Sequence, residues 1–100
     1  MKLKDLLKKD EFSLSFEVFP PKTDTAFQSV KTAVEKIAVL NPAFVSVTYG
    51  AGGGTSRYTL DMARAVKEKS GVSTIAHLTC VSSTKETVRQ KIKEMREYGI

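Results

Sequence analysis

The sequence predicts an α/β fold in which strands and helices alternate along the chain. Three short apolar segments typical of strands are centred near Phe16, Val47 and His77, about 30 residues apart. Each is followed by a segment whose apolar residues recur at three- and four-residue spacing, which is the pattern of an amphipathic helix. Strands that alternate with helices form parallel sheets, because each helix carries the chain back to the same end of the sheet.

The first predicted strand is SLSFEVF, residues 13–19, in which side chains alternate between two faces. One face carries Leu14, Phe16 and Val18, and the other carries Ser13, Ser15, Glu17 and Phe19. The pair Pro20-Pro21 ends the strand, because proline lacks the amide hydrogen that strand pairing needs. A leading helical segment is expected over residues 1–12, before this strand.

The next segment, residues 24–40, predicts the first long helix. Asp24 or Thr25 is expected to be its N-cap, because these side chains accept hydrogen bonds from the free amides of a first helical turn. The pair Asn41-Pro42 follows the last apolar residues and ends the helix. This helix completes the first strand–helix unit.

Two further units follow the same pattern. The strand FVSVTY, residues 44–49, leads through a glycine-rich loop into a helix over residues 56–69. The strand STIAHLT, residues 73–79, leads into a last helix that is expected to open with a capping box at Ser83-Thr-Lys-Glu86 and to end before Gly99.

The repeat length favours one parallel architecture. A (β/α)8 TIM barrel uses about 250 residues for eight units, or about 31 residues a unit, which matches the spacing here. Three units are too few to close a barrel, so we interpret residues 1–100 as the first three βα units of a single TIM-barrel catalytic domain. An open three-stranded sheet is the structural alternative.

Composition is ordinary for a globular chain, with 41% hydrophobic and 27% charged residues. No apolar run is long enough to span a bilayer, and the basic N-terminus lacks the apolar core of a secretory signal, so we expect a cytoplasmic protein with no membrane partner. The single cysteine, Cys80, has no partner for a disulfide and no neighbouring ligands at metal-binding spacing, so no metal site is predicted. The net charge of +5 comes from scattered lysines and arginines, which favours a solvated surface over nucleic-acid binding.

The glycine-rich stretch VTYGAGGGTS, residues 47–56, has the composition of a phosphate-binding loop but not its spacing. No Gly-Lys-Ser/Thr sequence follows it, and the third glycine of a dinucleotide-binding fingerprint would fall at Thr55. A turn that exposes bare backbone is the simpler interpretation.

Polar residues whose side chains could take part in catalysis or binding lie where the predicted strands end, which is where the active sites of parallel barrels are built. These residues are Glu17, Thr48, Tyr49 and His77. Glu17 has apolar neighbours, an unusual setting for a carboxylate and one that suits a general acid, although a solvated side chain is the alternative. His77 could equally be a hydrogen-bonded core residue, and Thr48 and Tyr49 could be simple strand formers.

Three of these segments together resemble a known family. SFEVFPPKT at residues 15–23, FVSVTYGAGGGTSRYTLDMA at residues 44–63 and AHLTC at residues 76–80 are similar, in order and spacing, to the N-terminal part of bacterial-type methylenetetrahydrofolate reductase. The resemblance covers residues 13–100. It implies a (β/α)8 barrel with non-covalent FAD, which takes hydride from NADH or NADPH and reduces 5,10-methylenetetrahydrofolate to 5-methyltetrahydrofolate for methionine synthesis.

The resemblance also implies roles for individual residues. Glu17 matches the glutamate that protonates the folate so that its five-membered ring opens. Thr48 matches a threonine near the flavin and the nicotinamide, and Tyr49, Ala51 and His77 match FAD contacts. The family's Arg-Gly-Asp motif and its remaining cofactor and folate contacts would fall after residue 100, so the choice between NADH and NADPH stays open. The resemblance also implies a homo-oligomer, because related bacterial enzymes often are homo-oligomers. The alternative is that the 100 residues by themselves are a non-catalytic folding or packing unit.

Overall fold

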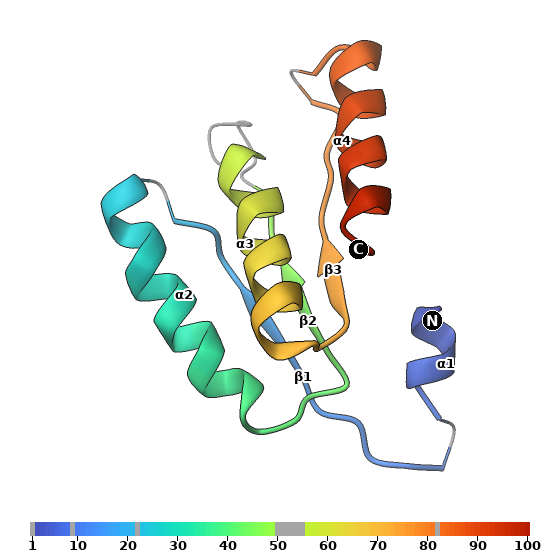
Figure 1. Cartoon of the computed structure of the whole chain (residues 1–100). Helices are drawn as coiled ribbons and strands as arrows, with labels where there is room; N and C mark the ends of the chain where they lie inside the picture. The colour runs from blue at the N-terminus through green and yellow to red at the C-terminus, as the bar shows by residue number, and fades with distance from the viewer. Residues whose placement is uncertain (1, 9, 22, 50–55, 82) are drawn as a thin grey trace.

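Three short strands form a parallel sheet in the order β1-β2-β3 (Figure 1). The strands are β1 at Ser15–Val18, β2 at Phe44–Val47 and β3 at Thr74–Ala76. The computed structural model describes residues 2–8, 10–21, 23–49, 56–81 and 83–100. Sequential parallel order is what consecutive strand–helix units produce, so the α/β fold predicted from the sequence is confirmed and is compatible with the first units of a barrel.

Four helices accompany the sheet. They are α1 at Leu3–Leu6, α2 at Asp24–Ala38, α3 at Ser56–Ser70 and α4 at Lys85–Glu97. Figure 1 shows α2 and α3 side by side over one face of the sheet, with α4 beside β3 and the short α1 near the amino-terminal ends of the strands. Long crossover helices on one face leave the opposite face of the three described strands without a helical cover.

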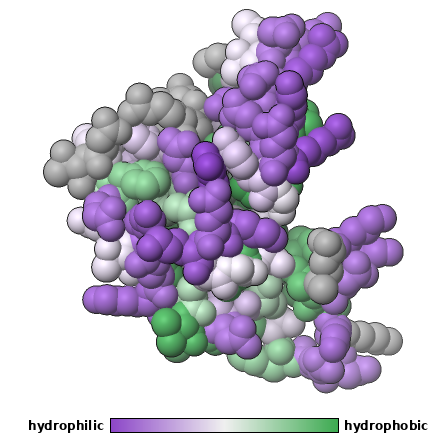
Figure 2. All heavy atoms as spheres, viewed as in Figure 1, coloured by the Kyte–Doolittle hydropathy of each residue, from purple (hydrophilic) through white to green (hydrophobic). Residues whose placement is uncertain are grey.

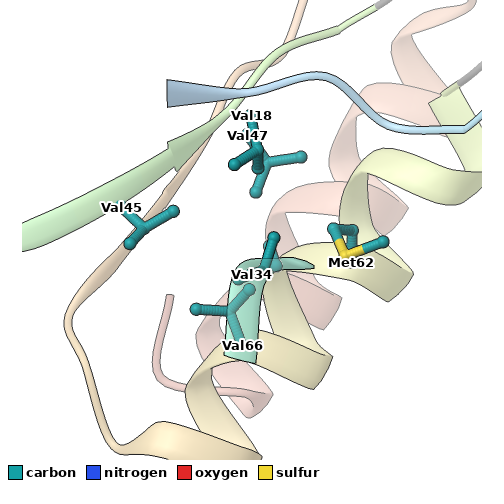
Figure 3. Close-up of a cluster of buried hydrophobic side chains, with 7 residues drawn as sticks. Val18, Val34, Val45, Val47, Met62 and Val66 are labelled. Atoms are coloured by element: carbon teal, nitrogen blue, oxygen red, sulfur yellow. The ribbon is translucent and has the colours of Figure 1, made fainter. Parts of the chain in front are cut away.

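The core lies between the sheet and α2 and α3. Its buried apolar residues are Val18, Val34, Val45, Val47, Met62, Ala63 and Val66. Figure 3 shows the valines of β1 and β2 gathered against side chains of the two helices. Successive side chains of a strand point to opposite faces of the sheet. The residues next to these strand valines therefore point toward the uncovered face.

The surface of α4 differs from that of the central helices. Figure 2 shows mainly hydrophilic side chains on the visible side of α4, and the helix has no buried residue. Its link to α3 runs through Arg64, whose guanidinium carbon lies 4.5 Å from the centre of the Tyr98 ring and whose Nε lies 2.8 Å from Glu68. The hydrogen bond to the Glu68 carboxylate raises the pKa of Arg64 above its ordinary value.

The N-caps differ from those predicted. Thr23 caps α2, accepting a hydrogen bond from the Ala26 amide over 3.2 Å, so neither Asp24 nor Thr25 has that role. Thr84 caps α4, accepting from the Thr87 amide over 3.1 Å, so the predicted capping box is wrong. Neighbouring hydroxyl and carboxyl residues can all serve as caps, and the backbone conformation at the entry of the helix decides which one does.

The strands are shorter than the sequence pattern suggested. Ladder pairing covers only residues for which a neighbouring strand is in register, whereas alternation continues beyond them. The backbone hydrogen bonds nevertheless extend past the strand ends, because Thr48 donates to the Val18 carbonyl and His77 donates to the Val47 carbonyl, both over 3.0 Å. These bonds keep the carboxyl-terminal ends of the three strands together.

Helix α2 ends at Ala38, two residues earlier than predicted, and a tight turn follows. Asn41 then adopts a φ of 54°, a left-handed conformation that asparagine tolerates better than most residues. Gly71 and Gly99 have φ values of 71° and 72° just after α3 and α4.

In the described part of the chain, no helix has both the length and the apolar character needed to cross a membrane.

Candidate functional site

Glu17, Ser46 and His77 lie together on the face of the sheet that faces away from the helices. The register pairs Glu17 with Ser46 on the neighbouring strand. Val18 and Val47, the residues that follow them, point into the helix-covered core, so alternation turns Glu17 and Ser46 to the other face. His77 follows Ala76, which packs against the same core, and therefore shares that face.

The three side chains meet at one oxygen atom. The Ser46 hydroxyl donates to Glu17 Oε1 over 3.5 Å. His77 Nε2 lies 3.6 Å from the same Oε1, close enough for an ion pair when the imidazole is protonated. Because β2 lies between β1 and β3, the glutamate and the histidine reach toward each other across the strand that carries Ser46.

The setting of Glu17 differs from the one expected. Its side chain is 53% exposed, which agrees with the solvated alternative and not with an apolar setting for this carboxyl. The reason is the strand periodicity: Phe16 and Val18 are adjacent in sequence but point to the opposite face. Polar partners from two other strands, in place of apolar flanks, form the surroundings of the carboxylate.

Thr48 is held at the end of β2 by its backbone. Its amide donates to Val18, and its carbonyl accepts a 2.8 Å hydrogen bond from the Thr59 hydroxyl on α3. Thr59 is only 1% exposed, so this contact ties the first turn of α3 to the strand end in a buried setting. Tyr49 follows directly and is half-buried. Ala51 and the glycine run lie outside the described residues.

The structure thus brings two of the predicted site residues, Glu17 and His77, into contact and places Thr48 and Tyr49 at the end of the strand between them. Sequence reasoning missed Ser46 and Thr59. A signal for Ser46 existed: it is a small polar residue between two valines in FVSVTY, two positions before Thr48 and on the same predicted face. No local pattern could have singled out Thr59, because its partner comes from another element.

Two other features of the structure lie outside the Glu17 cluster. The Thr79 hydroxyl, two residues after His77, is buried and has no hydrogen-bond partner within the described structure. A cavity of about 280 Å³ lies near the other end of the sheet, lined by α1, β3 and α4 residues that include Leu6, Ile75 and Met95. Its lining is mostly apolar and lacks titratable side chains, so the cavity is distinct from the Glu17 cluster. Among the described residues, no group of histidine, cysteine and acidic side chains converges as a metal site would require.

Comparison with known proteins decides the family. The family described as methylenetetrahydrofolate reductase matches residues 2–100, which is nearly the whole chain. The chain belongs to the methylenetetrahydrofolate reductase family. The resemblance predicted from the three sequence motifs is confirmed.

Sequence identity to individual proteins of the methylenetetrahydrofolate reductase family supports the same assignment. A protein of Pectobacterium carotovorum subsp. carotovorum named 5,10-methylenetetrahydrofolate reductase is 35% identical over 88 residues, covering 88% of this chain and 30% of that protein. The protein of the same name from Salmonella typhimurium is 34% identical over 90 residues, covering 90% of this chain and 30% of that protein. "Methylenetetrahydrofolate reductase (NADH) 1" of Arabidopsis thaliana is 31% identical over 99 residues, covering 99% of this chain and 17% of that protein. The chain therefore spans less than a third of the length of these relatives.

Proposed function

We propose that the chain contributes the proton donor and part of the cofactor site to an enzyme that reduces 5,10-methylenetetrahydrofolate to 5-methyltetrahydrofolate with NADH or NADPH. Family membership supports the reaction class. The observation that carries the proposal is the contact of Glu17 with His77 and Ser46 at the uncovered face of the sheet. A carboxyl group beside a hydroxyl from β2 and an imidazole just after β3 is a site that can hold and release a proton.

We also propose that the strands β1 to β3 are the first three of a (β/α)8 TIM barrel. The parallel order, the helices on one face and the spacing of about 30 residues between successive strands support this architecture. In a barrel, the uncovered face becomes the interior and the carboxyl ends of the strands carry the site, which is where Glu17, Thr48 and His77 lie. The relatives' greater length leaves room for five further units.

FAD is the proposed cofactor, and Thr48, Tyr49, Ala51 and His77 are the residues of this chain that would hold it. The donor set fits such a group, because an imidazole that is 43% exposed is followed two residues later by the buried Thr79 hydroxyl, which has no hydrogen-bond partner among the described residues. Polar groups of this kind near a strand end can hydrogen-bond a polar ring system. When bound, FAD supplies the hydride transfer between the nicotinamide and the folate.

Glu17 is the proposed catalytic residue of the folate step. Its carboxyl proton passes to a folate nitrogen, the carbon–nitrogen bond of the five-membered ring breaks, and the carbon becomes an electrophilic iminium ready for hydride. Loss of the proton leaves a carboxylate at Glu17. The Ser46 hydroxyl and a protonated His77 both approach Oε1, and each would stabilise that negative charge.

In the cell we propose one-carbon metabolism and methionine biosynthesis as the setting, the cytoplasm as the location and a homo-oligomer as the working form. The second candidate is a non-catalytic role for the 100 residues taken alone. Two observations favour it for the isolated segment: its described sheet has only three strands, and the uncovered face exposes Phe19, which is 73% accessible.

The proposal is tested with the full-length polypeptide purified with its flavin. We expect NADH or NADPH to bleach the flavin absorbance, and 5,10-methylenetetrahydrofolate to restore it with formation of 5-methyltetrahydrofolate. The Glu17→Gln variant should keep the first half-reaction and lose the second by about 100-fold or more, because general acid catalysis is worth that much. Normal folate turnover in this variant would remove Glu17 from the mechanism.

A further inference from the structure

Ser46 is a buried polar residue on the uncovered face of the sheet, and its hydroxyl contacts the Glu17 carboxylate. We propose that Ser46 is a positioning residue that holds Glu17 by Oε1 and so directs the acidic proton to Oε2, the oxygen that would face the folate. This inference rests on the proposed function and deepens it. It concerns which oxygen of the carboxyl group does the chemistry.

The backbone of Ser46 is firmly placed. It occupies the central strand, between Val45 and Val47, which have no exposed surface, and it pairs with Glu17 on one side and Ile75 on the other. Ser46 is 8% exposed, and a single rotatable bond of its side chain sets the position of the hydroxyl oxygen. The hydroxyl oxygen is therefore held by the sheet itself.

Glu17 has the opposite character. Its carboxylate ends a side chain with three rotatable bonds and is 53% exposed, so its own packing does not hold it in one orientation. A hydrogen bond from a rigid neighbour restricts those rotations. The distance of 3.5 Å is long, as catalytic hydrogen bonds often are before substrate binds, and such bonds shorten in the reacting complex.

Two donors at one oxygen distinguish the two oxygens of the carboxyl group. Ser46 Oγ and His77 Nε2 both approach Oε1. An oxygen that accepts hydrogen bonds is the worse place for the acidic proton, so the proton of the neutral acid resides on Oε2. The Ser46 hydroxyl can donate whatever the protonation of the imidazole, whereas His77 donates from Nε2 only with a proton there. Ser46 is therefore the donor that is present in every protonation state of His77.

The test uses the full-length flavin-loaded protein and three variants. Ser46→Ala removes the hydroxyl, Ser46→Thr keeps it, and Ser15→Ala is the matched control, because Ser15 lies on the same face of β1 two residues before Glu17 and is exposed. We expect Ser46→Ala to lower kcat of the folate half-reaction about 10- to 100-fold, the effect of losing a hydrogen bond to a charged group. KM for folate, flavin content and the rate of flavin reduction by nicotinamide should change little. Ser46→Thr should recover most of the loss, and Ser15→Ala should behave as the unaltered protein.

A second readout does not depend on turnover. In protein labelled with ¹³C at glutamate carboxyl groups, the Glu17 resonance is assigned by its absence in Glu17→Gln. It should move in Ser46→Ala and stay in place in Ser15→Ala. If the unaltered protein forms no 5-methyltetrahydrofolate, the proposed function is wrong. The Ser46 contact is tested independently by the spectrum, and a Glu17 resonance that does not move in Ser46→Ala would overturn it.

Three outcomes overturn the role of Ser46. One is an unchanged folate half-reaction in Ser46→Ala with the Glu17 resonance in place. The second is an equal loss in both half-reactions, or release of the flavin, because a merely structural serine would damage the site as a whole. The third is a loss that Ser46→Thr does not recover, which contradicts a role for the hydroxyl.

Discussion

His77 Nε2 lies 3.6 Å from Glu17 Oε1, although β1, which carries Glu17, and β3, which ends one residue before His77, are not neighbours in the sheet. The intervening strand places the small Ser46 side chain between them, which lets the two longer side chains approach each other. The contact joins the proposed proton donor to a residue proposed to hold the flavin.

We predict that His77→Ala weakens flavin retention while leaving the fold intact. The imidazole is 43% exposed, so little packing is lost, whereas a polar contact to the cofactor would be removed. The measurement is the flavin-to-protein ratio after gel filtration, with far-ultraviolet circular dichroism as the check on folding. Unchanged flavin affinity would show that His77 is only a partner of Glu17.

We predict that Thr59→Val destabilises the full-length protein by about 1–3 kcal/mol, because the Thr48 carbonyl loses a buried hydrogen-bond donor. Thr32→Val is the matched control. The Thr32 hydroxyl also donates to a backbone carbonyl, that of Gln28 over 2.9 Å, but on the exposed side of α2, so its loss should cost less than about 0.5 kcal/mol. Urea unfolding measures both. Equal values for the two variants would contradict the importance of the Thr59 contact.

We predict that Met62→Ala costs about 2–5 kcal/mol, the usual range for truncating a buried side chain to alanine. Met62 has no exposed surface and lies in the core between the sheet and the helices (Figure 3). Val39→Ala should be nearly neutral, since Val39 is 82% exposed. Denaturant midpoints compare the two, and a small effect at Met62 would place the core elsewhere.

We predict that the cap of α4 can be located by mutation. Thr84→Ala should cost about 1 kcal/mol, because the Thr87 amide loses its side-chain acceptor. Ser83→Ala should cost clearly less, although Ser83 is the residue that the capping-box pattern predicts. Thermal unfolding of the two variants decides between the two positions, and a larger loss at Ser83 would restore the capping box.

We predict that a polypeptide of residues 1–100, expressed alone, binds FAD weakly or not at all and shows no reductase activity. Copies of this polypeptide should also associate with one another. Within the described sheet, β1 and β3 each pair on one side only, and unpaired edges of apolar strands favour association. Analytical ultracentrifugation and flavin titration measure the two properties. A monodisperse monomer with cooperative unfolding and stoichiometric flavin would contradict the barrel interpretation and favour an open sheet.

The type and order of the elements could be predicted from the sequence. Alternation in SFEVF and in FVSV and the apolar spacing of α2, α3 and α4 each place an element where the structure has it. Element ends could not be predicted as well. Strand length depends on which residues find a partner in the ladder, and the caps at Thr23 and Thr84 depend on the backbone conformation at each helix entry.

The sequence by itself determined the α/β pattern, the family and the choice of Glu17 and His77 as candidates, because periodicity and motif spacing are local properties of the chain. Only the tertiary structure decided that these two side chains share one oxygen, that Ser46 joins them and that Thr59 holds the end of β2. Such contacts join residues from different elements. They follow from the register of the parallel strands and the docking of α3, which hydrogen bonds and packing across the whole fold establish.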